Sequence, residues 1–256
     1  MFLRLLFCIL LLLTHVQTRA DNDSPIVAVA ANFSPVLEEI ITRFTASTGF
    51  KVRMTSGSSG TLVRQIEQGA PFELFFSADE NYVIKLHEMK LTQDTGRIYA
   101  VGKLVLFIPE LSRLDKMQDI DGILRQLASN KQYRIAMANP ELAPYGLAAS
   151  QVLSRFIDMN MLRERIIQGE NVGQTAQFAL TGSVDAAFLP YSLAITKKMQ
   201  EQGNFELIPR DWYSPINQRM VLLNNAGNTA RSLYSYINSD TAHRIIDKYG
   251  YTTQTN

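Results

Sequence analysis

The chain has 256 residues, 46% of them hydrophobic and 19% charged, which is enough apolar material for the core of one large domain or of two lobes. Its formal net charge of +1 becomes −1 without Arg4 and Arg19, because 23 basic residues then face 24 acidic ones. A charge this close to zero gives no electrostatic footprint for nucleic acid or a membrane surface. Cys8 is the single cysteine and lies near the N-terminus, so disulfides, thiol catalysis and cysteine-bound metal are excluded from the chain after residue 20.

Residues 1–20 have the pattern of a secretory signal peptide. Arg4 supplies a basic start, residues 5–13 are apolar, and Ala20 precedes the polar stretch DND. The apolar run is shorter than the roughly 20 residues of a membrane-spanning helix, which favours cleavage over an uncleaved anchor. Cys8 falls inside this run instead of at its end, which disfavours a lipid anchor. We therefore expect an exported protein without direct membrane insertion, and a bacterial periplasm fits best.

From Ile26 onward, short β-branched or apolar runs alternate with amphipathic stretches, which is typical of an α/β fold with mainly parallel strands and crossover helices. The predicted strands are 26–31, 51–55, 73–77, 103–108, 134–138, 185–189, 205–208 and 219–223. The predicted helices are 34–48, 61–68, 79–86, 146–159, 172–181, 194–202 and 229–248. Ser34 and Pro35 open the first helix as N-cap and first residue, Gly49 closes it, and Asp79 is expected to cap the third.

No repeat, low-complexity tract or Pro/Gly/Ser linker separates these elements. Two lobes would therefore share strands across a hinge, with crossings predicted near 100–103 and 211–218. We expect one lobe to contain residues 21–101 and 214–256 and the other to contain residues 102–213. Ligands of open α/β folds bind in a cleft at the carboxyl ends of the parallel strands, so we expect the site between the lobes.

The stretch MTSGSSGTL, residues 54–62, is the most informative segment, because it joins a predicted strand to a predicted helix through small hydroxyl residues and glycine. Such a turn lets the backbone approach a ligand, directs several N–H groups to one point and places a helix N-terminus behind them. The stretch contains no lysine or arginine, which argues against a P-loop, and it lacks the Gly-x-Ser-x-Gly spacing of a nucleophile elbow. It predicts a neutral cradle for an anion.

Three further strand-to-helix turns have the same character. The turn at 30–35 contains Asn32, with a side-chain amide and a backbone N–H; the turn at 139–146 contains Tyr145, with a phenolic hydroxyl; the turn at 169–174 contains Val172, with only its backbone N–H. Each turn alone is equally well explained as ordinary capping. Together the four favour a site in which five to seven neutral hydrogen bonds would compensate a buried dianion.

Glu141 and Glu170 lie in two of these turns, and a carboxylate facing a dianion would repel it. We expect both to point to solvent or to cap helices, whereas a protonated phosphate species would favour such an acceptor in the site.

With these turns the chain resembles the periplasmic molybdate-binding proteins that serve ABC transporters for molybdate and tungstate. The most specific segment is GSSGTLVRQIEQGAP at 57–71, continuing into LFFSAD at 74–79, and supporting segments are AANF at 30–33, ANP at 138–140, PYG at 144–146 and IIDKYGY at 245–251. The resemblance covers nearly all of the chain after the leader. It implies a type II periplasmic binding fold of two lobes that holds a tetrahedral oxyanion in the cleft, without a cofactor or a metal cation.

The resemblance also implies the site residues. Asn32 stands where many members have serine, Ser59 falls on the hydroxyl ligand of the second turn, Tyr145 falls on the ligand of the Pro-x-Gly turn, and Val172 falls on a backbone N–H ligand. Further candidates are Ala31, Ser58 and Tyr191. Pro190 occupies a position where the better-known branch has a ligand tyrosine, and Tyr145 would replace that donor; the consequence for cavity size, and so for the anion chosen, stays open.

The expected function is capture of molybdate or tungstate and delivery to the membrane permease of an ABC transporter, by a monomer that binds no nucleic acid. One alternative is a carrier of another tetrahedral dianion such as sulfate. A second is a cleft enzyme, which the positions of His87 and His243 in helix-like segments far from the turns disfavour. A third, a structural secreted protein, would respond to no small anion.

Overall fold

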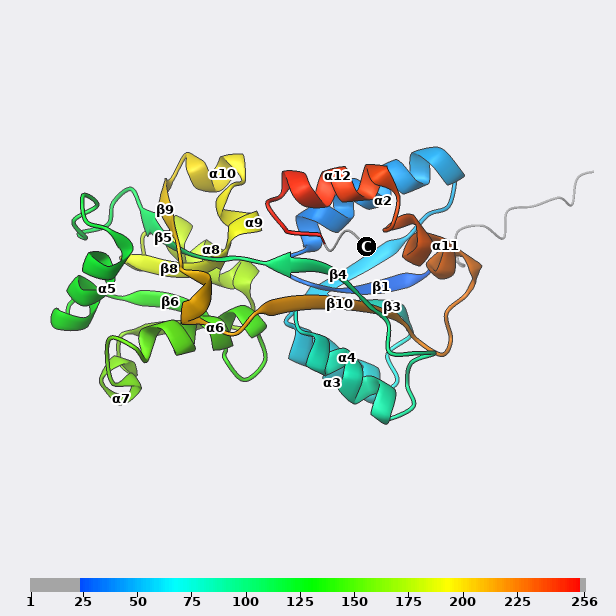
Figure 1. Cartoon of the computed structure of the whole chain (residues 1–256), viewed down its shortest axis with the longest axis horizontal. Coiled ribbons are helices and arrows are strands. Elements are labelled where there is room, and N and C mark those ends of the chain that lie inside the picture. The colour runs from blue at the N-terminus through cyan, green and yellow to red at the C-terminus, as the bar shows by residue number, and fades with distance from the viewer. Residues whose placement is uncertain (1–23, 254–256) are drawn as a thin grey trace, which may run out of the picture.

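The computed structural model describes residues 24–253 and has two lobes, each built on a five-stranded sheet (Figure 1). The predicted leader, residues 1–20, lies outside the described residues. Within residues 24–253, no helix combines the length and the apolar character needed to cross a membrane.

Lobe 1 contains the sheet with strand order β2-β1-β3-β10-β4. Its strands are β1 (Ile26–Ala30), β2 (Arg53–Gly57), β3 (Phe72–Ser77), β4 (Arg97–Gly102) and β10 (Ile216–Leu222). Its helices are α2 (Ser34–Thr48), α3 (Ser59–Glu67), α4 (Glu80–Glu88), α11 (Asn228–Tyr236) and α12 (Asp240–Lys248).

Lobe 2 contains the sheet with strand order β7-β6-β8-β5-β9. Its strands are β5 (Leu104–Pro109), β6 (Ile135–Ala138), β7 (Ile166–Gly169), β8 (Ala186–Pro190) and β9 (Gly203–Leu207). Its helices are α5 (Ile120–Ser129), α6 (Pro144–Leu153), α7 (Met159–Leu162), α8 (Val172–Leu180), α9 (Tyr191–Ala194), α10 (Lys197–Gln200) and the 3-10 turn η1 (Arg210–Trp212).

The two sheets have the same pattern of directions. In lobe 1, β2, β1 and β3 are parallel, and β10 runs antiparallel to both β3 and β4. In lobe 2, β7, β6 and β8 are parallel, and β5 runs antiparallel to both β8 and β9. One strand in each sheet therefore opposes the other four, which confirms the predicted α/β fold with mainly parallel strands. The chain passes between the lobes from β4 to β5 and returns from β9 to β10 (Figure 1).

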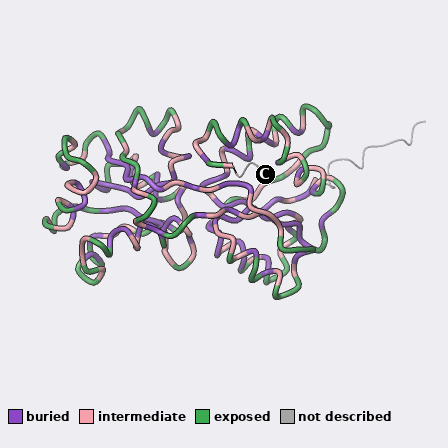
Figure 2. The backbone as a smooth tube through the Cα atoms, in the orientation of Figure 1, coloured by how far each residue is buried: buried purple, intermediate pink, exposed green. Residues whose placement is uncertain are grey.

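Alternating residues of the central strands face two helix layers. Val27 and Val29 of β1 pack in the cluster that includes α2 and α12, whereas Ala28 packs in the cluster that includes α3 and α4. Strand β5 alternates in the same way between the two clusters of lobe 2. A strand covered on both faces is apolar throughout, which explains its appearance in the sequence as a continuous run. Figure 2 shows the buried residues along these strands and the exposed ones on the outer faces of the helices.

The structure differs from the sequence prediction at several elements. Strands β4 and β7 and helix α5 were not predicted, and the predicted helix 229–248 is two helices, α11 and α12, separated at residues 237–239. Ser239 caps α12 by accepting a hydrogen bond from the Ala242 N–H, so a cap inside an amphipathic stretch divides it. The exact lobe boundaries, at 101/102 and 213/214, stay a prediction; strand β4 ends at Gly102 and β10 begins at Ile216.

Glu80 connects α4 to strand β10 through a hydrogen bond and an ion pair. Its carboxylate accepts from the Asn217 side-chain amide at 2.9 Å and pairs with Arg219 at 3.0 Å. The hydrogen bond from Asn217, with that from Arg219, holds the pKa of Glu80 below its ordinary value. A lowered pKa in the folded state adds stability that is present above the unfolded-state pKa and is lost as the pH falls through the folded-state pKa.

We therefore expect Glu80→Gln to reduce the free energy of unfolding by about 1 kcal/mol at pH 7, with the difference from wild type shrinking below about pH 4. Denaturant unfolding at pH 7 and at stepwise lower pH measures this. The control is Glu38→Gln, because it makes the same chemical change at an exposed position on α2. A Glu80 variant whose deficit stayed constant with pH would contradict the assignment.

Candidate functional site

A small cavity lies between the lobes where four strand-to-helix turns meet. Lobe 1 contributes the turns after β1 and β2 and Ala78, and lobe 2 contributes the turns that begin α6 and α8. The cavity volume is about 10 Å³, and its lining residues are Ala30, Ala31, Asn32, Gly57, Ser58, Ser59, Ala78, Ala143, Pro144, Tyr145, Asn171 and Val172. The four turns singled out in the sequence are thus in one place. A space of this size admits a water molecule or one small ion and excludes a sugar or a peptide unless the lobes separate.

None of the described residues that line the cavity has a charged side chain. Its positive character comes from the N-termini of α3, α6 and α8, which begin at Ser59, Pro144 and Val172. Each helix start carries a partial positive charge and N–H groups without a partner in the helix. Such a site attracts an anion through helix N-termini and N–H groups, without a positively charged side chain.

Several lining residues keep a backbone N–H that has no acceptor among residues 24–253. They are Asn32, Ser58, Ser59, Tyr145, Asn171 and Val172, whereas the neighbouring N–H groups of Ala31, Gly60, Thr61 and Gly173 are paired within the protein. Ser59 and Val172 are only 1% and 4% exposed. A buried N–H without a partner costs free energy, so converging unpaired donors indicate a ligand that accepts hydrogen bonds.

The two adjacent serines differ in what they offer to a ligand. The Ser58 hydroxyl donates to Thr61 Oγ1 at 2.7 Å and accepts from the Thr61 N–H at 3.3 Å, so it is used in capping α3. The Ser59 hydroxyl oxygen accepts from the Ala78 N–H at 2.9 Å. This bond fixes the oxygen and leaves the hydroxyl hydrogen without an acceptor among the described residues. Ser59 is therefore the serine whose side chain can donate into the cavity.

The Asn32 side chain does not behave as expected from the sequence. Its Nδ2 donates to Gln218 Oε1 and to Tyr251 Oη, both at 2.9 Å, so both amide hydrogens are used within the protein. The expectation of a side-chain amide for the anion is wrong for this arrangement. The backbone N–H of Asn32, which was also expected to contribute, is still available to donate to the anion.

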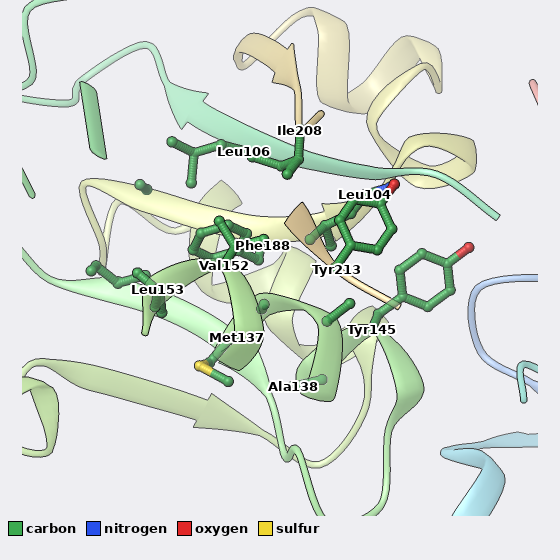
Figure 3. Packing of buried hydrophobic residues seen from close by; sticks show 14 of the residues in the cluster. Leu104, Leu106, Met137, Ala138, Tyr145, Val152, Leu153, Phe188, Ile208 and Tyr213 are labelled. Atoms are coloured by element: carbon green, nitrogen blue, oxygen red, sulfur yellow. The ribbon is translucent and has the colours of Figure 1, made fainter. Parts of the chain in front are cut away.

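Tyr145 projects from the core of lobe 2 toward lobe 1. Figure 3 shows its ring at the edge of the hydrophobic cluster with the hydroxyl pointing out of it, and the hydroxyl oxygen accepts from Gln218 Nε2 at 3.2 Å. Burial raises the pKa of the Tyr145 hydroxyl well above its ordinary value, so the group stays protonated at neutral pH. It therefore remains a neutral donor beside the cavity.

The chain is similar to known proteins over nearly all of the described residues. The family model for bacterial extracellular solute-binding proteins matches residues 26–252. The chain belongs to this family. Among curated relatives, the molybdate-binding protein ModA of Rhodobacter capsulatus is 37% identical over 232 residues, which cover 90% of this chain and 88% of that protein. ModA of Azotobacter vinelandii is 34% identical over 231 residues, which cover 89% of each chain.

The solved structure of the periplasmic molybdate-binding protein of Azotobacter vinelandii superimposes on this solute-binding protein with a TM-score of 0.80 and 32% identity. The match covers 91% of this chain and all of that chain. The two-lobed architecture is therefore shared with a solved periplasmic molybdate-binding protein.

The additional site candidates occupy different positions in this solute-binding protein. Ala31 and Ser58 line the cavity, whereas Tyr191 is not among its lining residues. The Tyr191 ring packs against Phe205 with centroids 5.5 Å apart and lies beside Gly250. Of the two tyrosines weighed from the sequence, Tyr145 is the one at the cavity.

No motif in the sequence marks Gln218 and Tyr251, which hold Asn32, or Ala78, which orients Ser59. Gln218 lies inside a strand and Ala78 is apolar, so neither has a polar-turn signal. Tyr251 was noticed only as part of the closing IIDKYGY segment.

The residues considered for catalysis lie away from the cavity lining. His87 Nδ1 is 3.1 Å from Thr92 Oγ1, and His243 lies on α12. Asp79 caps α4 by accepting from the Asn81 N–H at 2.8 Å, as predicted.

Glu141 and Glu170 are exposed and absent from the lining, which confirms the expectation that they do not face the site. Among the described residues, no group of three or more His, Cys, Asp or Glu side chains is placed to hold a metal ion.

Proposed function

We propose that this solute-binding protein captures molybdate or tungstate in the periplasm and delivers the anion to the permease of an ABC transporter, with no chemistry on the anion. The observation that carries the proposal is the cavity of unpaired backbone N–H groups and the Ser59 hydroxyl, without a charged side chain, at the meeting point of four turns. The names of the relatives in Rhodobacter capsulatus and Azotobacter vinelandii support the choice of anion.

Neutral donors suit a carrier because they bind a dianion without the strong attraction of a fixed counter-charge, which would slow release. The backbone N–H groups of Asn32, Ser59, Tyr145 and Val172, with the Ser59 and Tyr145 hydroxyls, would replace part of the hydration shell of the anion. Ser58 and Ala31 would line the cavity around the anion. No carboxylate of residues 24–253 lines the cavity, which favours a fully ionised anion over protonated phosphate.

Lobe closure would supply the conformational signal to the permease. The closed arrangement has direct contacts across the cleft: the Gly60 N–H donates to the Leu142 carbonyl at 2.9 Å, and the Tyr82 hydroxyl donates to the Glu141 carbonyl at 3.3 Å. Because the donors come from both lobes, the anion binds the closed state better than the open state and shifts the population toward it. We expect the carrier to act as a monomer, with the lobes divided at 101/102 and 213/214.

Isothermal titration of the purified protein without residues 1–20 tests the proposal, with molybdate, tungstate, sulfate and phosphate as separate titrants after exhaustive dialysis. We expect tight binding of molybdate and tungstate and weak or absent binding of sulfate and phosphate. Equal affinity for sulfate would make the protein a general or sulfate carrier. No heat with any of the four would contradict the proposed function.

A further inference from the structure

A buried polar network adjoins the cavity and joins the two lobes. Its members are no more than 6% exposed, and they are Asn32, Tyr99, Tyr145, Ser192, Gln218 and Tyr251. Only Asn32 and Tyr145 line the cavity. The other four are not among its lining residues, so lining the cavity does not explain why they are buried.

Ser192 connects the network across the cleft. It lies on the short helix α9 of lobe 2, and its Oγ donates to the Asn32 carbonyl of lobe 1 at 3.0 Å. The same oxygen is 2.9 Å from Tyr251 Oη, also of lobe 1. Opening of the cleft would break both contacts, because the partners belong to different lobes.

Both ends of Asn32 are fixed by this network. Its carbonyl accepts from Ser192, and the single hydrogen of the Tyr251 hydroxyl goes either to this carbonyl, 2.9 Å away, or to Ser192 Oγ. Its side-chain amide donates to Gln218 and Tyr251. Its backbone N–H is one of the unpaired donors at the cavity. When the lobes close, the hydrogen bond from Ser192 therefore holds Asn32 in place, and Asn32 presents its backbone N–H to the ligand.

We propose that Ser192 is a positioning residue that latches the lobes closed and fixes Asn32, and so sets the affinity and the residence time of the anion without touching it. The inference rests on the proposed function. In the open state the hydroxyl, the carbonyl and the Tyr251 hydroxyl would bond to water, so the net gain on closure is that of an ordinary hydrogen bond. Such a latch biases closure without enforcing it, and the anion still decides the population.

The test compares wild type with Ser192→Ala by isothermal titration and by stopped-flow dissociation of molybdate and of tungstate. We expect the dissociation constant and the dissociation rate to rise about tenfold, by the same factor for both anions, because the lost hydroxyl acts through closure. The control is Ser112→Ala, which removes a hydroxyl that donates to the Asp185 carbonyl at 2.7 Å within lobe 2. This control is expected to bind as wild type does.

Tyr251→Phe provides a second variant, since it removes the partner hydroxyl and keeps the ring. We expect it to weaken both anions, and the double variant with Ser192→Ala to lose less than the sum of the two single losses, as groups in one network do. Circular dichroism and thermal unfolding confirm that each variant folds.

Three results would overturn the latch. Wild-type affinity and dissociation rate in Ser192→Ala would remove it while leaving the proposed function intact. A different factor for molybdate and tungstate would mean that Ser192 contacts the anion and is not a positioning residue. A wild-type protein that binds none of the tested anions would overturn the proposed function and, with it, this inference.

Discussion

Replacing Ser59 by alanine is expected to weaken molybdate binding by about 1.5–3 kcal/mol, which is roughly ten- to hundredfold in the dissociation constant. The Ser59 oxygen is held by the Ala78 N–H at 2.9 Å, so its hydrogen is directed by the protein before the ligand arrives. The variant loses a hydrogen bond to a charged acceptor, and it also leaves the Ala78 N–H without a partner at a residue that is 1% exposed. We therefore expect a lower unfolding temperature of the anion-free protein as well. Isothermal titration and thermal unfolding measure the two effects.

Ser58→Ala is the matched control for this experiment, because it makes the same chemical change one residue earlier. The Ser58 hydroxyl is used by Thr61 as a helix cap, so its loss is expected to reduce stability by about 1 kcal/mol and to affect affinity much less than Ser59→Ala. Equal losses of affinity in the two variants would contradict the assignment of Ser59 as the donor side chain.

The main features of the fold could be predicted from the sequence because they depend on local patterns. Continuous apolar runs such as 104–109 correspond to strands covered on both faces, and the small polar residues after them correspond to turns at the carboxyl ends of the strands. The rule that ligands bind at such ends was enough to predict that the four turns lie near one another.

The direction of each donor could not be predicted, because it depends on partners distant in sequence. Asn32 is 186 residues from Gln218 and 219 residues from Tyr251, and these two residues decide that its amide faces the protein. Ser59 is 19 residues from Ala78, whose N–H leaves the hydroxyl hydrogen of Ser59 for the cavity. Composition indicates that a turn is rich in donors, but only tertiary contacts show which donors are already used.

Replacing Gly60 by alanine is expected to weaken molybdate binding by roughly five- to hundredfold, corresponding to about 1–3 kcal/mol of overpacking in the closed state, without destabilising the anion-free protein. An added Cβ would lie 2.9 Å from the Tyr82 hydroxyl and 3.0 Å from Leu142 Cα across the cleft. The lobes could then approach only by straining the contact where the Gly60 N–H donates to the Leu142 carbonyl. In the open state the clash with Leu142 is absent, and the Tyr82 hydroxyl, at the far end of its side chain, is released from the Glu141 carbonyl and can move aside. Alanine also has the higher helix propensity, so the unfolding temperature without anion should be close to that of wild type. Gly173→Ala is the control. Gly173 is likewise the second residue of a helix at the cavity, but its Cβ would meet only Asn171 Oδ1 of its own lobe, at 3.1 Å.

Isothermal titration and thermal unfolding of both variants test whether binding depends on closure at Gly60. Wild-type affinity in Gly60→Ala would show that binding does not require the close approach of Gly60 to Leu142. Lost affinity with retained stability would tie binding to closure.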